Sequence, residues 1–178
     1  MSAAHDFDPR RIVEVLDRHH VEYVLVGGYA AQLYGARRPT YDIDITPATT
    51  QENLELLSAA LRELGARIRI DDQPEGLPFD CSGESLRGMQ MLNLRTAAGD
   101  LDLTFVPAGF PSGYESLLPG AQARSIGGIT VTVAGLNDVI KSKTAAARAK
   151  DLDALPELIS IAERDRNRSQ GGDHGPEL

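Results

Sequence analysis

The sequence contains a single cysteine, Cys81, so the chain cannot form an internal disulfide. A lone cysteine is typical of proteins from a reducing compartment. The chain has no run of about 18 apolar residues, and its first residues, MSAAHDFDPRR, lack the apolar core of a secretion signal. We therefore expect a cytoplasmic protein that does not enter a membrane.

Basic residues are scarce relative to acidic ones: 18 Lys and Arg stand against 26 Asp and Glu, for a net charge of −8. This balance argues against a protein that coats nucleic acid through a large basic face. It leaves room for a small basic patch that binds one RNA end or a nucleotide, and some of the acidity can belong to a metal site. The 178 residues, 42% hydrophobic and 25% charged, suit one globular domain.

Hydrophobic periodicity and turn residues predict alternating helices and strands, which indicates an α/β (α+β) fold with a mixed sheet flanked by helices and a helical C-terminal portion. Asp8 and Thr49 are the expected N-caps of two of the helices. Helices are predicted over 8–20, 29–36, 49–65 and, as a pair, within 135–164; strands over 21–26, 40–46, 66–70, 121–126 and 128–133, with two more within 89–106; and a loop over 71–83. We expect a single domain over 1–167, with a core over about 8–133 and a helical part over about 135–167, followed by a disordered tail over 168–178.

Two carboxylates, Asp42 and Asp44, stand one residue apart in a stretch, YDIDI, that otherwise predicts a β-strand. Strand alternation places both on one face and the isoleucines on the other. The stretch GDLDLTF repeats the pattern with Asp100 and Asp102. Like charges on one face of a sheet repel, and a hard divalent cation with oxygen ligands removes that repulsion. If the two strands are neighbours, three carboxylates converge on a site for Mg²⁺, or Mn²⁺; the alternative is a half-exposed strand whose polar face happens to be Asp.

Gly27 and Gly28 separate a short apolar strand from a helix of small residues. Backbone N–H groups at the start of a helix can bind a phosphate, although a tight turn alone would also explain the pair. The segment matches neither GxxxxGK[ST] nor GxGxxG.

Taken together, residues 27–45, GGYAAQLYGARRPTYDIDI, resemble the nucleotidyltransferase superfamily with the DNA polymerase β-like fold. There, a strand leads to a Gly-Gly or Gly-Ser helix start, the next strand carries D-x-D, and a later strand supplies a third carboxylate, here Asp102. The form GG…A…G…R.T.DID is similar to the AbiEii/MenT-type toxin nucleotidyltransferases of bacterial toxin–antitoxin systems. Asp100 has no place in this pattern, and we interpret it as a turn residue.

The helical stretch LNDVIKSKTAAARAKDLDAL is similar to a second motif of the same family, so the resemblance covers about residues 20–160. Lys143, Arg148, Lys150 and Asp151 occupy its characteristic positions. Without the resemblance, Arg148 and Lys150 are explained by the preference of cations for a helix C-terminus.

The resemblance implies an enzyme that transfers NMP from an NTP to an acceptor hydroxyl and releases pyrophosphate. Asp42 and Asp44 would hold the catalytic Mg²⁺ ions, and Asp102 would complete the set and activate the hydroxyl. Lys143 would bind the triphosphate and neutralise charge on the leaving pyrophosphate. The remaining nucleotide-binding residues would be Gly27, Gly28, Arg38, Thr40, Arg148 and Asp151.

For three of these residues the sequence allows more than one role. Arg38 can instead be solvated loop charge. Thr40 would bring a hydroxyl near the metal and, in some family members, is the target of an inhibitory antitoxin kinase. Asp151 can orient Lys143, orient Arg148 or contact the nucleotide.

By the same resemblance, the acceptor would be the 3′ end of tRNA, the outcome a block of translation, and the partner a cognate antitoxin. A nucleotidyltransferase that modifies antibiotics such as lincosamides or aminoglycosides is the main alternative, since those enzymes resemble the same N-terminal block. A protein adenylyltransferase and a catalytically silent nucleotide-binding module are the others.

Overall fold

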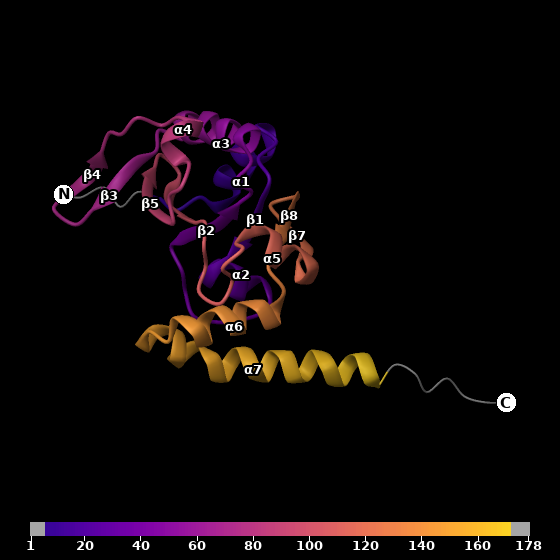
Figure 1. The fold of residues 1–178 in the computed structure, drawn as a ribbon. Coiled ribbons are helices and arrows are strands. Elements are labelled where there is room, and N and C mark those ends of the chain that lie inside the picture. Colours follow the sequence, from indigo (N-terminus) through magenta and orange to yellow (C-terminus); the bar gives the residue numbers. More distant parts are fainter. Residues whose placement is uncertain (1–5, 172–178) are drawn as a thin grey trace.

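A computed structural model of the chain describes residues 6–171. Its helices are α1 Pro9–Arg18, α2 Gly27–Leu33, α3 Gln51–Glu63, α4 Gly83–Leu86, α5 Tyr114–Leu117, α6 Leu136–Ala146 and α7 Ala149–Gln170, with a 3₁₀ turn at Leu118–Gly120 (Figure 1). Its strands are β1 Tyr23–Val26, β2 Asp42–Pro47, β3 Arg67–Ile70, β4 Gln73–Leu77, β5 Met91–Thr96, β6 Gly99–Thr104, β7 Gln122–Ile126 and β8 Ile129–Val133. Within the described range, no helix has both the length and the apolar character needed to cross a membrane.

The strands form one eight-stranded sheet in the order β4-β3-β5-β6-β2-β1-β8-β7. Two neighbouring pairs, β2–β6 and β1–β8, are parallel. The remaining neighbours are antiparallel. The structure therefore confirms the predicted mixed sheet flanked by helices. Because β2 and β6 lie at its centre, side chains of two segments far apart in sequence meet there.

The apolar face of the sheet packs against α1 and α3 (Figure 1). Alternation along the two central strands sends every second side chain into this core. Ile43 and Ile45 of β2, and Leu101 and Leu103 of β6, are fully buried. Burial of side chains of this size stabilises the fold by about 1.5–3 kcal/mol each, so the strands are held with their other face fixed. Asp8 caps α1 as predicted, accepting a hydrogen bond from the backbone N–H of Arg11 at 3.0 Å.

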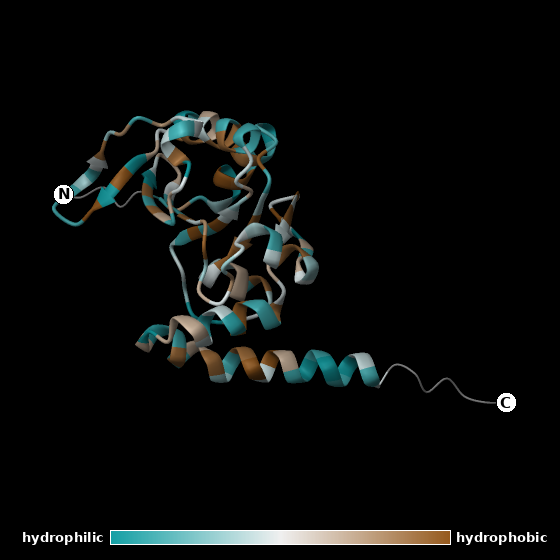
Figure 2. Cartoon of the chain, in the orientation of Figure 1, coloured by the Kyte–Doolittle hydropathy of each residue, from teal (hydrophilic) through white to brown (hydrophobic). Residues whose placement is uncertain are grey.

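Helices α2, α6 and α7 form the other side of the molecule. Helix α2 contacts β1, β2 and α6, and α6 packs along α7, which continues outward past the body of the protein (Figure 1). The first part of α7 carries the apolar residues and its far end is hydrophilic (Figure 2). Leu158, Ile161 and Ala162 are its buried apolar side chains. Between the two helices, Ala147 adopts a left-handed conformation with φ 52°, which ends α6 and turns the chain back.

Three local predictions were wrong. The segment 71–83 contains strand β4, which pairs with β3 at the sheet edge, and leads into α4 with Ser82 as its cap. Only Gly76 of β4 is buried, so the strand had no apolar alternation to reveal it. The N-cap of α3 is Thr50 and not Thr49. Residues 168–170 are helical, as part of α7, whereas residues 172–178 of the predicted tail lie outside the described range.

Candidate active site

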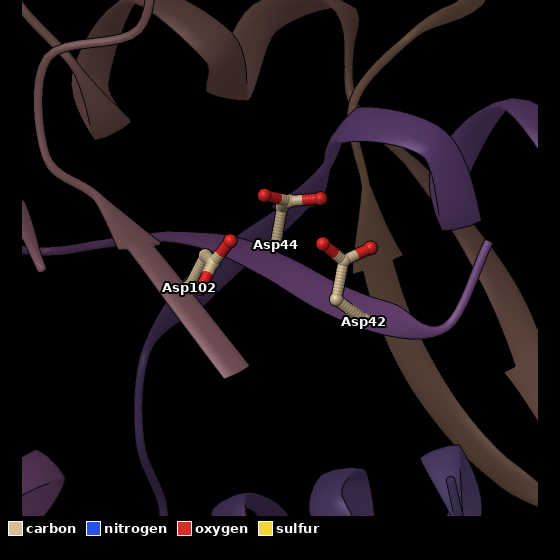
Figure 3. Close-up of side chains that lie close together, drawn as sticks. All are labelled: Asp42, Asp44 and Asp102. Carbon is tan, nitrogen blue, oxygen red and sulfur yellow. The ribbon is translucent and has the colours of Figure 1, made fainter. Parts of the chain in front are cut away.

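The parallel pairing of β2 with β6 brings the two aspartate pairs into register. Asp42 stands opposite Asp100, and Asp44 opposite Asp102. Asp42, Asp44 and Asp102 each offer a carboxylate oxygen, and these oxygens lie within 4.8 Å of one another. Figure 3 shows the three side chains rising from the same side of the two strands. The sequence-predicted carboxylates are therefore brought together, and Asp100 is a strand residue rather than the predicted turn residue.

The electrostatic cost of the cluster is concentrated on Asp44. Burial raises its pKa to about 7, and the negative charges of Asp42 and Asp102 act in the same direction. Lys150 and Lys143 oppose the rise, so both lysines lie within electrostatic reach of the cluster. Burial also raises the pKa of Asp102, against the charge of Arg69. Without a cation, the cluster holds its negative charge at a cost near neutral pH.

The residues present fit a divalent cation. Asp102 is only 9% exposed, and its Oδ1 atom is buried without a hydrogen-bond donor. Nη2 of Arg69 lies 3.0 Å from Oδ1 and 3.1 Å from Oδ2, but it has hydrogen-bond geometry only toward Oδ2. A buried carboxylate oxygen without a donor, close to two further carboxylates, is the environment in which a hard cation such as Mg²⁺ or Mn²⁺ binds.

Gly27 lets the backbone between β1 and α2 approach this cluster. Its φ is +72°, and a Cβ atom at this position would lie 2.3 Å from Oδ2 of Asp44. Val26, the last residue of β1, pairs with Asp44 across the antiparallel ladder, which explains the proximity. Glycine is thus required here for its conformation and for its lack of a side chain.

The loop before β2 places Thr40 beside the carboxylates and Arg38 against the start of α7. The Thr40 hydroxyl donates to Oδ1 of Asp42 at 2.6 Å, and a Cβ at Gly28 would lie 3.2 Å from that hydroxyl. Nη1 of Arg38 donates to the backbone carbonyl of Lys150 at 2.9 Å, so this loop is tied to the start of α7. Thr40 therefore holds one of the candidate metal ligands, and Arg38 joins the two sides of the site.

The buried carboxylate of Asp151 pairs with two basic residues, Lys143 of α6 and Arg148, which precedes α7. Asp151 is 2% exposed. Its carboxylate accepts from Nε of Arg148 at 2.6 Å and contacts Nζ of Lys143 at 3.4 Å. Burial alone would raise the pKa of Asp151, but the hydrogen bond and charge of Arg148, with Lys143, bring it below its ordinary value. Asp151 thus contacts both Lys143 and Arg148, two of the three possibilities that the sequence left open, and the left-handed turn at Ala147 brings them together.

Two arginines beside the carboxylates were not among the predicted site residues. Arg69 of β3 pairs with Asp100 and Asp102, and Arg95 of β5 pairs with Asp100. Their signal was present in the sequence as the alternation in RIRI, which puts Arg67 and Arg69 on the polar face of a strand. Sequence alone did not show that this strand lies two places from β6 in the sheet.

Comparison with known proteins shows the fold. No family model matches the sequence, and no curated protein matches it. Among solved structures, the lincosamide antibiotic adenylyltransferase LnuA, with lincomycin bound, is 13% identical, with 88% of this chain and 99% of that chain covered and a TM-score of 0.58. The antibiotic-resistance factor ANT(2'')-Ia is 16% identical, with 91% of each chain covered and a TM-score of 0.53. TM1012 from Thermotoga maritima, assigned as a nucleotidyltransferase, is 14% identical, with 90% and 99% covered and a TM-score of 0.52. The chain therefore has the fold of these proteins, and the predicted fold class is confirmed.

Replacement of Gly27 by alanine should disturb Asp44, with Gly35→Ala as the matched control. Both glycines have positive φ, but nothing lies within 4 Å of a Cβ at Gly35, whereas a Cβ at Gly27 meets the Asp44 carboxylate. We expect Gly27→Ala to lower the free energy of unfolding by about 1–3 kcal/mol more than Gly35→Ala, measured by urea denaturation. Equal losses would show that backbone strain, and not the approach to Asp44, makes Gly27 necessary.

Asp44→Asn should stabilise the metal-free protein at high pH. The pKa of an Asp in the unfolded chain is about 3.9, whereas the pKa of Asp44 in the folded protein is about 7. Between these two pKa values the folded state binds more protons than the unfolded state. The free energy of unfolding of the wild type therefore falls as pH rises, and the fall is complete above about pH 7. In EDTA we expect Asp44→Asn to gain about 2–4 kcal/mol over wild type between about pH 5 and about pH 8, measured by urea denaturation. The same pH dependence in both proteins would mean that Asp44 ionises normally.

Proposed function

We propose that the protein is a divalent-metal-dependent nucleotidyltransferase, which transfers NMP from an NTP to an acceptor hydroxyl. The observation that carries the proposal is the convergence of the Asp42, Asp44 and Asp102 carboxylates. It is supported by the fold of solved nucleotidyltransferases and by a basic cluster within electrostatic reach of the carboxylates. A silent nucleotide-binding module would have no need to keep three mutually repelling carboxylates in this geometry.

Asp42, Asp44 and Asp102 would hold Mg²⁺ or Mn²⁺, which when bound neutralises phosphate charge and orients the reacting oxygens. The acceptor oxygen forms a bond to the α-phosphorus, and the bond from that phosphorus to the pyrophosphate oxygen breaks. Asp102 would accept the proton of the acceptor hydroxyl. The other two carboxylates would hold the cation that orients the α-phosphate, so catalysis rests mainly on orientation and electrostatics.

Lys143 and Arg148 are the proposed ligands of the triphosphate. Both are held by Asp151, so their charged groups are positioned before the nucleotide arrives. Lys143 would stabilise the charge that develops on the leaving pyrophosphate. Asp151 acts through these two residues, because its own carboxylate is buried.

Four further residues complete the proposed nucleotide site on the side of β1 and α2. Gly27 and Gly28 keep the backbone free of side chains next to Asp44 and Thr40, which gives phosphate groups access to backbone N–H groups. Thr40 orients Asp42 by its hydrogen bond. Arg38 lies where the loop meets α7 and supplies positive charge at the rim.

For the acceptor, we propose the 3′ end of tRNA, in a toxin of the AbiEii/MenT type that blocks translation and is neutralised by a cognate antitoxin. Support comes from the sequence resemblance, which includes the K…R.KD pattern of α6 and α7. NTPs and tRNA are both cytoplasmic, so the predicted location belongs to the same proposal.

An antibiotic acceptor is the second candidate. LnuA is a lincosamide adenylyltransferase solved with lincomycin, and ANT(2'')-Ia was solved with adenylyl-2"-tobramycin. The net charge of −8 favours a cationic acceptor of that kind. Incubation of the protein with each labelled NTP and with tRNA, lincomycin or tobramycin separates the two: we expect label on tRNA, and label on an antibiotic alone would replace the tRNA proposal.

Asp42→Ala should abolish transfer while the fold is retained. The variant removes a candidate metal ligand from a partly exposed position, so we expect at least about 100-fold less labelled product and an unchanged circular dichroism spectrum. Asp71→Ala, in the exposed turn between β3 and β4, is the control and should transfer normally. Retained transfer by Asp42→Ala would rule out this site.

Lys143→Ala should weaken use of the NTP, with Lys141→Ala as control on the same helix. Lys141 is exposed and its Nζ lies 4.5 Å from the centre of the Phe110 ring, whereas Lys143 faces Asp151. Loss of a charge-assisted phosphate contact should lower kcat/KM for NTP by about 10–100-fold in Lys143→Ala. Equal kinetics in the two variants would remove Lys143 from the proposed triphosphate site.

A further inference from the structure

The guanidinium of Arg69 bridges two carboxylates at the edge of the candidate metal site. Its Nη1 lies 2.9 Å from Oδ2 of Asp100, and its Nη2 donates to Oδ2 of Asp102 at 3.1 Å. The Arg69 side chain is 24% exposed and that of Asp102 is 13% exposed, so the contact is largely shielded from water. The two ends of one rigid, planar group therefore hold neighbouring carboxylates at the same time.

The Arg69 side chain reaches the site from β3, which lies two places from β6 in the sheet. Strand β5 separates β3 from β6, and Arg69 must reach across it. The pairing of β3 with β4 shifts register between Ile68 and Ile70: Ile68 pairs with Leu77 and Ile70 with Gln73, so the extra residues lie on β4, opposite Arg69. Gly76, at φ +71° on β4, packs so closely there that a Cβ would lie 2.6 Å from the Ile68 carbonyl. Arg67 pairs with Arg95, and Arg95 with Asp100, so strand alternation puts Arg69 on the same face of the sheet as Asp100 and Asp102.

Asp100 also holds Arg69, and Asp100 is itself held by a second arginine, Arg95. Asp100 lies opposite Asp42 in the sheet, but it pairs with arginines: with Arg69, and with Nε of Arg95 at 3.1 Å. Arg95 also donates to the backbone carbonyl of Pro74 in the β3–β4 hairpin. The series Arg95, Asp100, Arg69 and Asp102 therefore connects the outer strands of the sheet to the third carboxylate of the site.

We propose that Arg69 is a positioning residue that holds the Asp102 carboxylate in place beside Asp42 and Asp44. The assignment rests on the proposed function. It accounts for two observations together: Nη2 of Arg69 lies 3.0 Å from Oδ1 and 3.1 Å from Oδ2 of Asp102, and its hydrogen-bond geometry toward Oδ2 alone leaves the buried Oδ1 without a donor. Arg69 does not need to touch the substrate, because it acts through the orientation of Asp102. Asp100 is assigned as the residue that keeps Arg69 in place.

Positioning and ligation predict different changes in metal binding. Asp102→Asn removes a ligand, so it should weaken Mn²⁺ binding and slow transfer. Arg69→Met keeps all three carboxylates. The lost orientation of Asp102 should weaken Mn²⁺ binding and the lost positive charge should strengthen it, so we expect a small net change in Mn²⁺ affinity while transfer slows. A merely structural arginine would instead lower stability and leave the kcat of the folded protein unchanged.

The test compares wild type, Arg69→Met, Arg69→Lys and Asp102→Asn, with Arg67→Met as control. Arg67 lies on the same strand and donates to the backbone carbonyls of Glu75 and Gly76. Mn²⁺ binding to the nucleotide-free protein is measured from the electron paramagnetic resonance signal of free Mn²⁺. Transfer is measured with labelled NTP and whichever of tRNA, lincomycin or tobramycin the wild type labels, and circular dichroism checks folding.

For Arg69→Met we expect kcat to fall about 10–100-fold, with KM for the NTP and the affinity for Mn²⁺ within about 3-fold of wild type or better. Arg69→Lys should recover only part of kcat, because an ammonium cannot bridge two carboxylates as a guanidinium does. If Arg69→Met does not fold, Arg69→Lys carries the same comparison.

The assignment of Arg69 is overturned by wild-type kcat in Arg69→Met or full recovery in Arg69→Lys. It is equally overturned if Arg69→Met loses Mn²⁺ binding as far as Asp102→Asn does. A wild type that binds no Mn²⁺ and transfers no nucleotide contradicts the proposed function instead.

Discussion

The in-register parallel pairing of β2 with β6 forces carboxylates from two segments of the chain onto one patch of the sheet. Buried isoleucines and leucines on the opposite face lock both strands in place, so the aspartates cannot turn away without exposing the core. Burial, together with the negative charges of Asp42 and Asp102, raises the pKa of Asp44 to about 7. A divalent cation bound there would remove the repulsion among these carboxylates.

The surrounding structure is arranged to manage that charge from two sides. On one side, the turn between α6 and α7 holds Lys143 and Arg148 on the buried Asp151, close enough to act on Asp44. On the other, Arg69 neutralises part of the Asp100 and Asp102 charge. The basic residues on the two sides differ in chemistry. Lys143 lies on α6 and Arg148 in the turn before α7, and their charges suit a polyphosphate, whereas Arg69 lies within the sheet and pairs with two carboxylates.

Much of the fold could be predicted because period-2 alternation and helix caps are local. In the stretches YDIDI and GDLDLTF, the alternation of polar and apolar residues predicts both the central strands and their polar face. The glycine pair was also visible, although the reason for Gly27 was not, since its close approach to Asp44 depends on the pairing of β1 with β2. Strand β4 has one buried residue, so its sequence lacks the alternation of polar and apolar residues that would predict a strand.

What could not be predicted depends on contacts between distant segments. The role of Asp100 is set by Arg69 and Arg95, which come from two other strands. Asp151 had three possible roles in the sequence because its contacts depend on the left-handed turn at Ala147. The comparisons show the same division: no family model matches the sequence, whereas solved nucleotidyltransferases share the fold at 13–16% identity. The fold is therefore recognised from the arrangement of strands, where the sequence alone gives no match.

The most direct test of the central claim is a crystal structure of the protein with Mn²⁺ and a non-hydrolysable NTP analogue, with the metal located by anomalous scattering. Our account predicts an anomalous peak bounded by oxygens of Asp42, Asp44 and Asp102, with the triphosphate between the metal and Lys143. An analogue bound elsewhere, or Mn²⁺ absent from the three carboxylates, would contradict it.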